Sequence, residues 1–144
     1  MDLNIEFARK TALAYNTVCK SLCQELKLPQ TAFDILMFLA NNPEYKTASA
    51  IVEIRKLKAN LVSVNVDKLV HDGYLMRKAV ENDRRKTELI CTEHAQPIIA
   101  RGRQLQKDFI SQLMAGMDEQ TQQTLIAILS IMDHNLDTIL KGDS

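Results

Sequence analysis

The stretch LVSVNVDKLVHDGYLMRKAVENDRRKTELICTEHA, residues 61–95, decides the fold because its hydrophobic spacing changes at Gly73. Before this glycine, apolar residues recur every three or four positions, which predicts a helix over about residues 59–72. After it, residues 74–79 and 87–91 are short runs typical of strands, and the charged segment between them contains an Asn-Asp turn signal. The stretch therefore predicts a helix followed by a two-stranded β-hairpin with a basic tip.

Upstream, the segment LKLPQTAFDILMFLANNP, residues 26–43, predicts a helix over about 31–40 that lies between two prolines. Thr47 can cap a further short helix over 48–55. The helices over 48–55 and 59–72 would be joined by a tight turn. Such a pair of short helices is the arrangement that places the second helix in the major groove of DNA.

The helix predicted over 59–72 has a polar outward face, made of Asn60, Ser63, Asn65, Asp67, Lys68 and His71. Asn60 and Ser63 are short hydrogen-bonding side chains that can reach base edges in a groove, and Lys68 is a further candidate DNA contact on this helix. The alternative is that this face is simply solvated, and the two helices alone do not decide between these interpretations.

The hairpin concentrates basic residues at its tip. Lys78, Arg84, Arg85 and Lys86 all fall within the segment KAVENDRRKTE. On a narrow projection, an arginine can enter the minor groove while its neighbours neutralise phosphates. A charged tip by itself is usually a solvated loop, but this one directly follows a candidate recognition helix, so we predict double-stranded DNA as the partner.

The two ends of the chain predict long amphipathic helices. Apolar residues recur at helical spacing over about 5–26 and 119–140, and Asp118 can cap the second of these helices. Thr92 can cap a long helix over about 93–115 that ends at Gly116. One small middle module cannot cover apolar stripes of this length. We therefore expect the first and last helices to be covered by one another or by a second copy of the chain.

The composition is that of a globular protein. With 144 residues, of which 46% are hydrophobic, the chain favours a single domain. Its formal net charge is zero, yet residues 46–86 carry ten Lys and Arg against five Asp and Glu, a local charge of +5 that suits a DNA-facing module. There is no run of roughly 18 apolar residues and no secretory signal, so we expect a cytoplasmic protein without a membrane partner.

The cysteines Cys19, Cys23 and Cys91 are an odd count, and we expect reduced thiols. Cys19 and Cys23 lie four residues apart on one helix face, which makes them candidates for oxidant sensing, whereas the alternative is that both are small buried core residues. The sequence lacks metal-site spacings, phosphate-binding loops and nucleophile motifs. We therefore expect no metal, no cofactor and no enzymatic activity.

Residues 26–102 resemble the MarR-type family of bacterial regulators. The similar features are a Leu-x-x-Pro-Gln entry to the second helix, a helix ending in Asp-Lys-Leu-x-x-x-Gly-Tyr-Leu, an Asp-x-Arg wing, and a strand leading into Leu-x-x-Thr. The resemblance implies a mainly α fold with a small β-hairpin wing: a winged helix-turn-helix over 30–92, a linking helix over 93–115, and dimerisation helices over 1–28 and 116–144.

The function that this resemblance implies is sequence-specific regulation of transcription by a homodimer on a pseudo-palindromic operator, most often as a ligand-responsive repressor. By position, it assigns four residues to the major groove, namely Asn60, Leu61, Ser63 and Val64. It also makes Arg85 the wing arginine and Asp83 the ion-pair partner that holds it. The sequence departs from the family pattern at Leu61, where Ser or Thr is common, and at Val64, where Arg is common, which shifts readout toward thymine methyl groups.

A small effector held between the dimerisation helices and the winged module would control DNA binding by preferring one of their arrangements. Tyr15, Phe33 and Met37 are candidates to line such a pocket, and ordinary core packing is the alternative. A winged helix used only for protein contacts is a second possible function. The zero net charge and Val64 favour it, while the basic hairpin tip opposes it.

Overall fold

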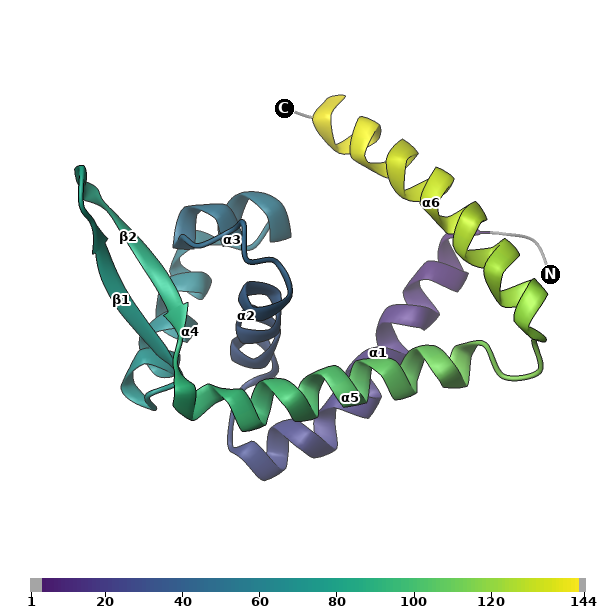
Figure 1. The fold of residues 1–144 in the computed structure, drawn as a ribbon, viewed down its shortest axis with the longest axis horizontal. Coiled ribbons are helices and arrows are strands. Elements are labelled where there is room, and N and C mark those ends of the chain that lie inside the picture. The colour runs from purple at the N-terminus through teal and green to yellow at the C-terminus, as the bar shows by residue number, and fades with distance from the viewer. Residues whose placement is uncertain (1–3, 143–144) are drawn as a thin grey trace. The chain divides into compact units, whose positions relative to one another are not determined.

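The computed structural model describes residues 4–142, with the side chain of Arg84 excepted. In chain order its elements are α1 (Ile5–Leu26), α2 (Gln30–Asn41), α3 (Ala48–Arg55), α4 (Ala59–His71), β1 (Leu75–Val80), β2 (Asp83–Cys91), the 3-10 turn η1 (Glu93–Ala95), α5 (Gln96–Leu113) and α6 (Glu119–Gly142) (Figure 1). This is the mainly helical chain with one antiparallel hairpin that the sequence predicts. It divides into two compact units, the first ending at Lys107 and the second beginning at Asp108.

Side chains cap several of the helices where the sequence indicates. Thr47 Oγ1 accepts a hydrogen bond from the Ala50 amide at 3.1 Å, which satisfies one of the free N–H groups at the start of α3. Asp118 Oδ1 does the same for the Thr121 amide of α6 at 2.8 Å. Both predicted caps are confirmed.

Gly73 ends α4 and turns the chain into the hairpin. Its φ of +82° lies in the left-handed region, where a side chain would be strained. The next amide, that of Tyr74, donates back to the Leu69 carbonyl at 2.8 Å. Thr92, predicted to cap the following helix with its side chain, instead donates its hydroxyl to the Gly73 carbonyl at 2.5 Å and so ties together the two ends of the hairpin.

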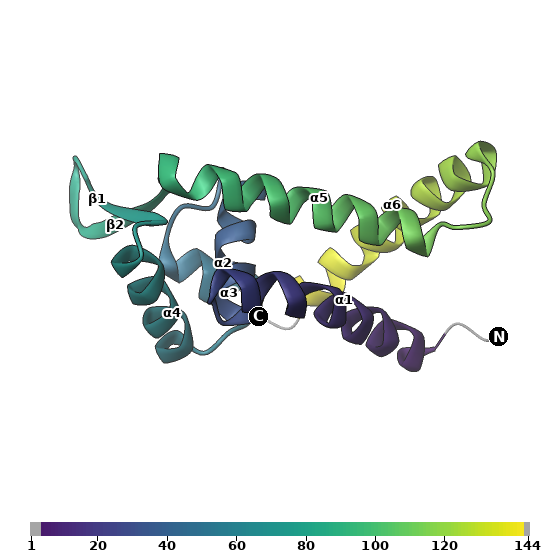
Figure 2. The same cartoon turned by 90° about the horizontal axis from the view of Figure 1, so that it is seen from below.

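The hairpin is longer than the sequence predicts. The pairing runs from Leu75 opposite Cys91 to Ala79 opposite Thr87, and then shifts so that Val80 lies opposite Asp83. The connection is thus the two-residue turn Glu81-Asn82, and the segment 84–86 belongs to β2, where it forms an irregularity opposite the Ala79-Val80 step. The predicted loop over 80–86 is therefore wrong in its bounds. The hairpin lies beside α4 in two perpendicular views (Figures 1 and 2).

Most of the core of the first unit lies between α2, α3, α4 and the base of the hairpin. Its buried members are Leu28, Ala32, Ile35, Leu36, Phe38, Leu39, Ile51, Val62, Val66, Leu69, Leu75, Leu89, Ala95, Ile98 and Ile99. A second cluster joins α1 to α2 and contains Cys19, Leu22, Cys23, Phe33 and Met37. α5 approaches this cluster at Gly102, where an added Cβ would lie 2.5 Å from the Met37 Sδ atom. Glycine at this position permits the close approach of α5 to α2.

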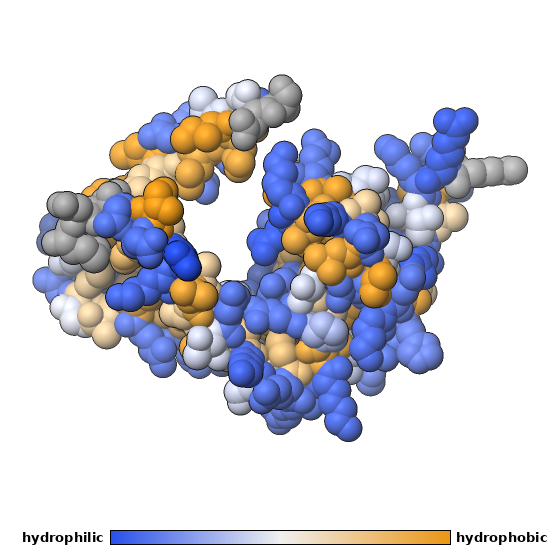
Figure 3. All heavy atoms as spheres, turned by 180° about the vertical axis from the view of Figure 1, so that it is seen from behind, coloured by the Kyte–Doolittle hydropathy of each residue, from blue (hydrophilic) through white to orange (hydrophobic). Residues whose placement is uncertain are grey.

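Helix α6, in the second unit, has no buried residue among those described. Apolar side chains gather along it in the space-filling view (Figure 3). Those more than a third exposed are Ile126, Ile128, Leu129, Ile131, Met132, Leu136, Ile139 and Leu140. α1 exposes a shorter apolar set, Ile5, Phe7 and Leu13. None of the helices within residues 4–142 combines the length and the apolar character needed to cross a membrane.

Candidate nucleic-acid interface

The inward face of α4 anchors this helix to the core. Val62, Val66 and Leu69 recur at helical spacing and are buried against α2, α3 and the hairpin. Only three residues, Lys56 to Lys58, separate α3 from α4. Lys56 takes a left-handed conformation, with φ of +53°, and so reverses the chain between the two helices. The two helices therefore form the helix-turn-helix that the sequence predicts.

The outward face of α4 exposes four of the predicted contact residues: Asn60, Leu61, Ser63 and Val64. Leu61 is 40% exposed and Val64 is 66% exposed, so both apolar side chains face solvent on the surface opposite the core. Asn60 Oδ1 accepts a hydrogen bond from the Leu61 amide at 2.9 Å, which holds its side chain at the start of the helix. The fifth predicted residue, Lys68, forms an ion pair with Asp72 at 3.0 Å one turn later.

Asn65 does not lie on this polar face, contrary to the prediction. It is 6% exposed, and its amide nitrogen donates to the Leu61 carbonyl of the preceding turn at 2.8 Å. A short amide side chain can donate a hydrogen bond to a carbonyl of its own helix in this way, which offsets the cost of burying the side chain. Sequence spacing alone could not detect this bond.

The hairpin adds a contact to α4 that the sequence analysis did not identify. Arg77, on β1, forms an ion pair with Asp67 on the outer side of α4. Both side chains remain largely exposed, so the pair contributes little to stability. Its consequence is electrostatic, because it neutralises a carboxylate on the helix that carries the proposed contact face.

Asp83, Arg85 and Lys86 lie toward the far end of the hairpin, whereas Lys78 lies opposite Glu88 in its middle. Lys78 is on β1, while Arg85 and Lys86 are in the irregular part of β2 with exposed side chains. The side chain of Arg84, also predicted to contact DNA, lies outside what the structure describes. Asp83 Oδ1 accepts a hydrogen bond from the Arg85 amide at 3.0 Å. Within the described residues no ion pair joins Asp83 to the Arg85 guanidinium, so Asp83 holds the backbone of the wing arginine and not its side chain.

Comparison with known proteins assigns this geometry to a family. The MarR family matches over residues 26–86, which span the helix-turn-helix and the hairpin as far as Lys86. This segment of the chain is similar to the MarR family. None of the curated proteins matches it.

Solved structures share the fold of this chain at low sequence identity. A protein described as a MarR-family transcriptional regulator from Listeria monocytogenes, complexed with 26mer DNA, is 18% identical with a TM-score of 0.82, covering 97% of this chain and 93% of its own. A MarR protein from Peptoclostridium difficile is 19% identical with a TM-score of 0.83, covering 100% of this chain and 94% of its own. The apo form of wild-type MarR from E. coli is 16% identical with a TM-score of 0.73, covering 92% and 98%.

The three residues expected to line an effector pocket pack together between α1 and α2, but only two of them line a cavity. Tyr15 and Met37 line a cavity of about 250 Å³. Phe33 is fully buried in the core between α1 and α2, as the packing alternative has it. The Tyr15 hydroxyl accepts a hydrogen bond from Gln106 Nε2 at 3.0 Å, and burial raises the pKa of Tyr15 to about 12. Tyr15 is therefore a neutral hydroxyl at the edge of this cavity.

The two helix cysteines are buried core residues. Cys19 is 0% exposed and Cys23 is 6% exposed, and burial raises the pKa of both thiols, that of Cys23 to about 11. A thiolate is the reactive form, so this environment opposes oxidation. Among the described residues, no group of three or more His, Cys, Asp or Glu side chains is arranged to hold a metal ion.

Proposed function

We propose that this protein is a sequence-specific DNA-binding transcriptional regulator that acts as a homodimer on a pseudo-palindromic operator. The observation that carries the proposal is the outward face of α4, which exposes two short polar and two apolar side chains beside a hairpin with a basic end. This is the geometry with which a winged helix-turn-helix inserts one helix in the major groove and a hairpin alongside. The Listeria relative complexed with DNA supports it.

Within α4 we assign base readout to the exposed first half of the helix. Asn60 and Ser63 would hydrogen-bond base edges, and an Asn side chain suits adenine. Leu61 and Val64 would contact thymine methyl groups, because they are apolar and reach outward without a protein partner on the same chain. Lys68, farther along, would neutralise a phosphate.

In the wing we assign contacts with DNA to Lys78, Arg84, Arg85 and Lys86. Arg85 would enter the minor groove, because the Asp83 carboxylate holds the backbone of Arg85 in place at the end of the hairpin. The others would neutralise phosphates, which makes binding strongly dependent on salt.

The homodimer is proposed from the apolar surfaces at the ends of the chain. The exposed apolar side chains of α6, with those of α1, form far more apolar surface than a monomer usually leaves in water. A two-fold dimer through residues 1–28 and 116–144 would cover them and would present two α4 helices to half-sites about one helical turn, roughly 10 base pairs, apart.

We further propose that the output is repression controlled by a small effector. The cavity lined by Tyr15 and Met37 is bounded by residues of α1, α2, α3 and α5, so a molecule bound there would contact the first helix of the helix-turn-helix together with α1 and α5. Such a molecule changes DNA binding only if it binds the DNA-competent and the incompetent arrangements with different affinities.

The test is selection of duplexes from a random pool, followed by fluorescence anisotropy across a range of salt concentrations. A palindromic sequence should be enriched, and log affinity should fall linearly with log salt. Replacing both Lys78 and Lys86 by alanine should reduce the slope by about 2, one for each lost phosphate contact, whereas Lys107→Ala on α5 should leave it unchanged. If no sequence is enriched and the double variant binds like the parent chain, the DNA function is refuted and the winged helix is better assigned to protein contacts.

A further inference from the structure

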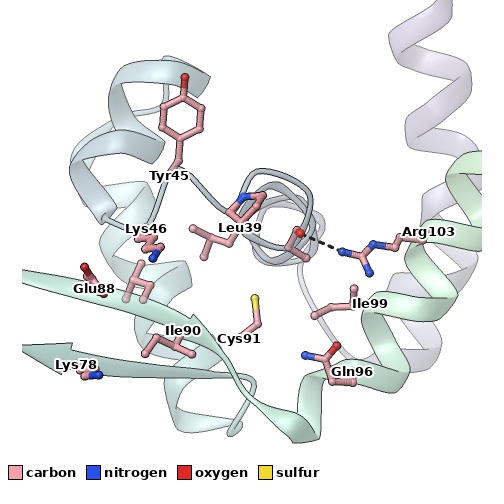
Figure 4. A pocket seen from close by; sticks show the side chains of 13 residues that line it. Leu39, Tyr45, Lys46, Lys78, Glu88, Ile90, Cys91, Gln96, Ile99 and Arg103 are labelled. Carbon is pink, nitrogen blue, oxygen red and sulfur yellow. Dashed lines mark hydrogen bonds between the residues drawn. The ribbon is translucent and has the colours of Figure 1, made fainter.

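The cavity lined by Tyr15 and Met37 also contains two side chains of opposite charge. Asp34 lies on α2 and Arg55 ends α3, and the cavity that both of them line has a volume of about 250 Å³. We call it the Asp34 cavity. It is separate from the pocket at the base of the hairpin, which Figure 4 shows, and the two share no residue. The remaining side chains that line the Asp34 cavity are those of Phe38, Asn41, Asn42 and Gln106.

The Asp34 carboxylate has no partner in the folded chain. It is partly buried, and among the described residues it takes part in neither a hydrogen bond nor an ion pair. Burial raises the pKa of Asp34, and the positive charge of Arg55 opposes this rise. An unpaired carboxylate that is partly removed from water costs stability, and such groups gather at functional sites because a bound molecule can supply the missing partner.

The Arg55 guanidinium lines the same cavity about one helical turn away from Asp34. It lies over the ring of Phe38, 5.9 Å from the ring centre. Phe38 follows Asp34 by four positions on α2, which is a rise of roughly 6 Å along the helix. No ion pair joins Arg55 to Asp34 within the described part of the chain. The two charges are therefore apart, but one small molecule can reach both.

A chain of hydrogen bonds holds another wall of the Asp34 cavity. The Arg103 guanidinium donates to the Ala40 carbonyl at 3.0 Å, the bond drawn in Figure 4, and to the Asn41 side-chain oxygen at 3.1 Å. The Asn41 side-chain nitrogen donates to Gln106 Oε1 at 3.1 Å, and Gln106 Nε2 donates to the Tyr15 hydroxyl at 3.0 Å. These bonds join α1, α2 and α5, so this wall is in place before a ligand binds, which lowers the cost of binding.

We propose that the Asp34 cavity binds a small aliphatic α-amino acid as its zwitterion. The ammonium group would donate to the Asp34 carboxylate, and the carboxylate would accept from the Arg55 guanidinium. The short aliphatic side chain would lie against Met37 and Phe38. A ligand with one charge would meet a like charge in the cavity and would leave the other charge without a partner, so the cavity selects against it.

The Asp34 cavity is the one to which we assign the effector. The inference therefore names the chemical class of that effector, and in this respect it rests on the proposed function. Binding of an amino acid can be measured without DNA, so failure of the amino-acid site and failure of the proposed function are told apart.

The test uses Tyr15 as a reporter. The chain has three tyrosines, Tyr15, Tyr45 and Tyr74, and of these Tyr15 lines the Asp34 cavity. Incorporation of 3-fluorotyrosine gives each of them a ¹⁹F resonance, and Tyr15→Phe identifies the resonance of Tyr15. The spectrum is followed near neutral pH during titration with L-valine, with isobutylamine, which is L-valine without its carboxylate, and with isovalerate, which is L-valine without its amino group.

L-valine should shift the Tyr15 resonance in a saturable way and leave those of Tyr45 and Tyr74 in place. Isobutylamine and isovalerate should bind at least about tenfold more weakly, because each lacks one charged hydrogen bond. For the same reason, Asp34→Asn and Arg55→Gln should each raise the Kd for L-valine about tenfold. Glu53→Gln, which removes an exposed carboxylate of α3 outside the cavity, should leave this Kd unchanged.

Circular dichroism confirms that each variant is folded, and Asp34→Asn removes a carboxylate that costs stability. The proposal is overturned if L-valine does not shift the Tyr15 resonance, or if either analogue with one charge binds as tightly as L-valine. It is also overturned if Asp34→Asn or Arg55→Gln keeps the parent Kd. A chain that binds L-valine as expected but selects no operator would support the amino-acid site and refute the proposed DNA function.

Discussion

Val62 and Val64 lie two residues apart on α4 but face opposite environments, which makes them a matched pair for separating folding from binding. Val62 is 1% exposed within the core, whereas Val64 is 66% exposed on the proposed DNA-contact face. Replacing each by alanine removes the same two methyl groups. The structure therefore predicts opposite effects from one and the same chemical change.

For Val62→Ala, the lost burial is about two CH₂ equivalents at about 0.8 kcal/mol each, and the remaining cavity adds to this, so we expect a destabilisation of about 2 kcal/mol. For Val64→Ala, the change in unfolding free energy should stay within about 0.5 kcal/mol, because the side chain is largely exposed and alanine favours a helix. Urea unfolding followed by circular dichroism measures both values.

The binding experiment should reverse this order. If Val64 covers a thymine methyl group, its truncation should weaken operator binding by about 1 kcal/mol, close to fivefold in Kd. Val62→Ala should bind with the parent Kd once the unfolded fraction is taken into account. Equal destabilisation by the two variants would refute the assignment of the α4 faces, and unchanged operator binding by Val64→Ala would refute its role in readout.

Two further predictions concern buried ionisable groups. Burial raises the pKa of Asp34, with Arg55 opposing, so its ionised form costs stability that is regained as pH falls. Asp34→Asn should therefore raise the free energy of unfolding at about pH 7 but not at about pH 3, and a variant less stable at both pH values would contradict this. The pKa of about 11 for Cys23 should reduce its thiolate fraction near pH 8 about a hundredfold relative to an ordinary thiol. Iodoacetamide should accordingly modify Cys23 and Cys19 far more slowly in the native chain than in urea, and equal rates would favour the redox alternative.

The local determinants of this fold are readable in the sequence. Gly73 is where helical spacing stops, and its left-handed φ is the physical reason. Thr47 and Asp118 mark helix starts because a side-chain oxygen three positions before a free amide needs no distant partner. The order of helices, the hairpin after α4 and its basic residues follow from such short-range rules.

The candidate interface was only partly predictable. The apolar spacing of α4 fixes which side faces the core, and so it correctly leaves Asn60 and Val64 exposed. The same rule misplaced Asn65, since its bond to the Leu61 carbonyl permits burial of a polar side chain. It also gave no sign of the pairing between Arg77 and Asp67, which depends on how the hairpin packs against α4.

Caps, glycines and hydrophobic periods act between residues a few positions apart, so the succession of elements can be predicted from the amino-acid sequence. The continuation of the hairpin through residues 83–86 cannot, because strand pairing is a property of two segments together. Likewise, only folding brings Lys46, Cys91 and Arg103 around one pocket. Contacts between residues so distant along the chain leave no local pattern, since they arise from the packing of whole elements on a shared core.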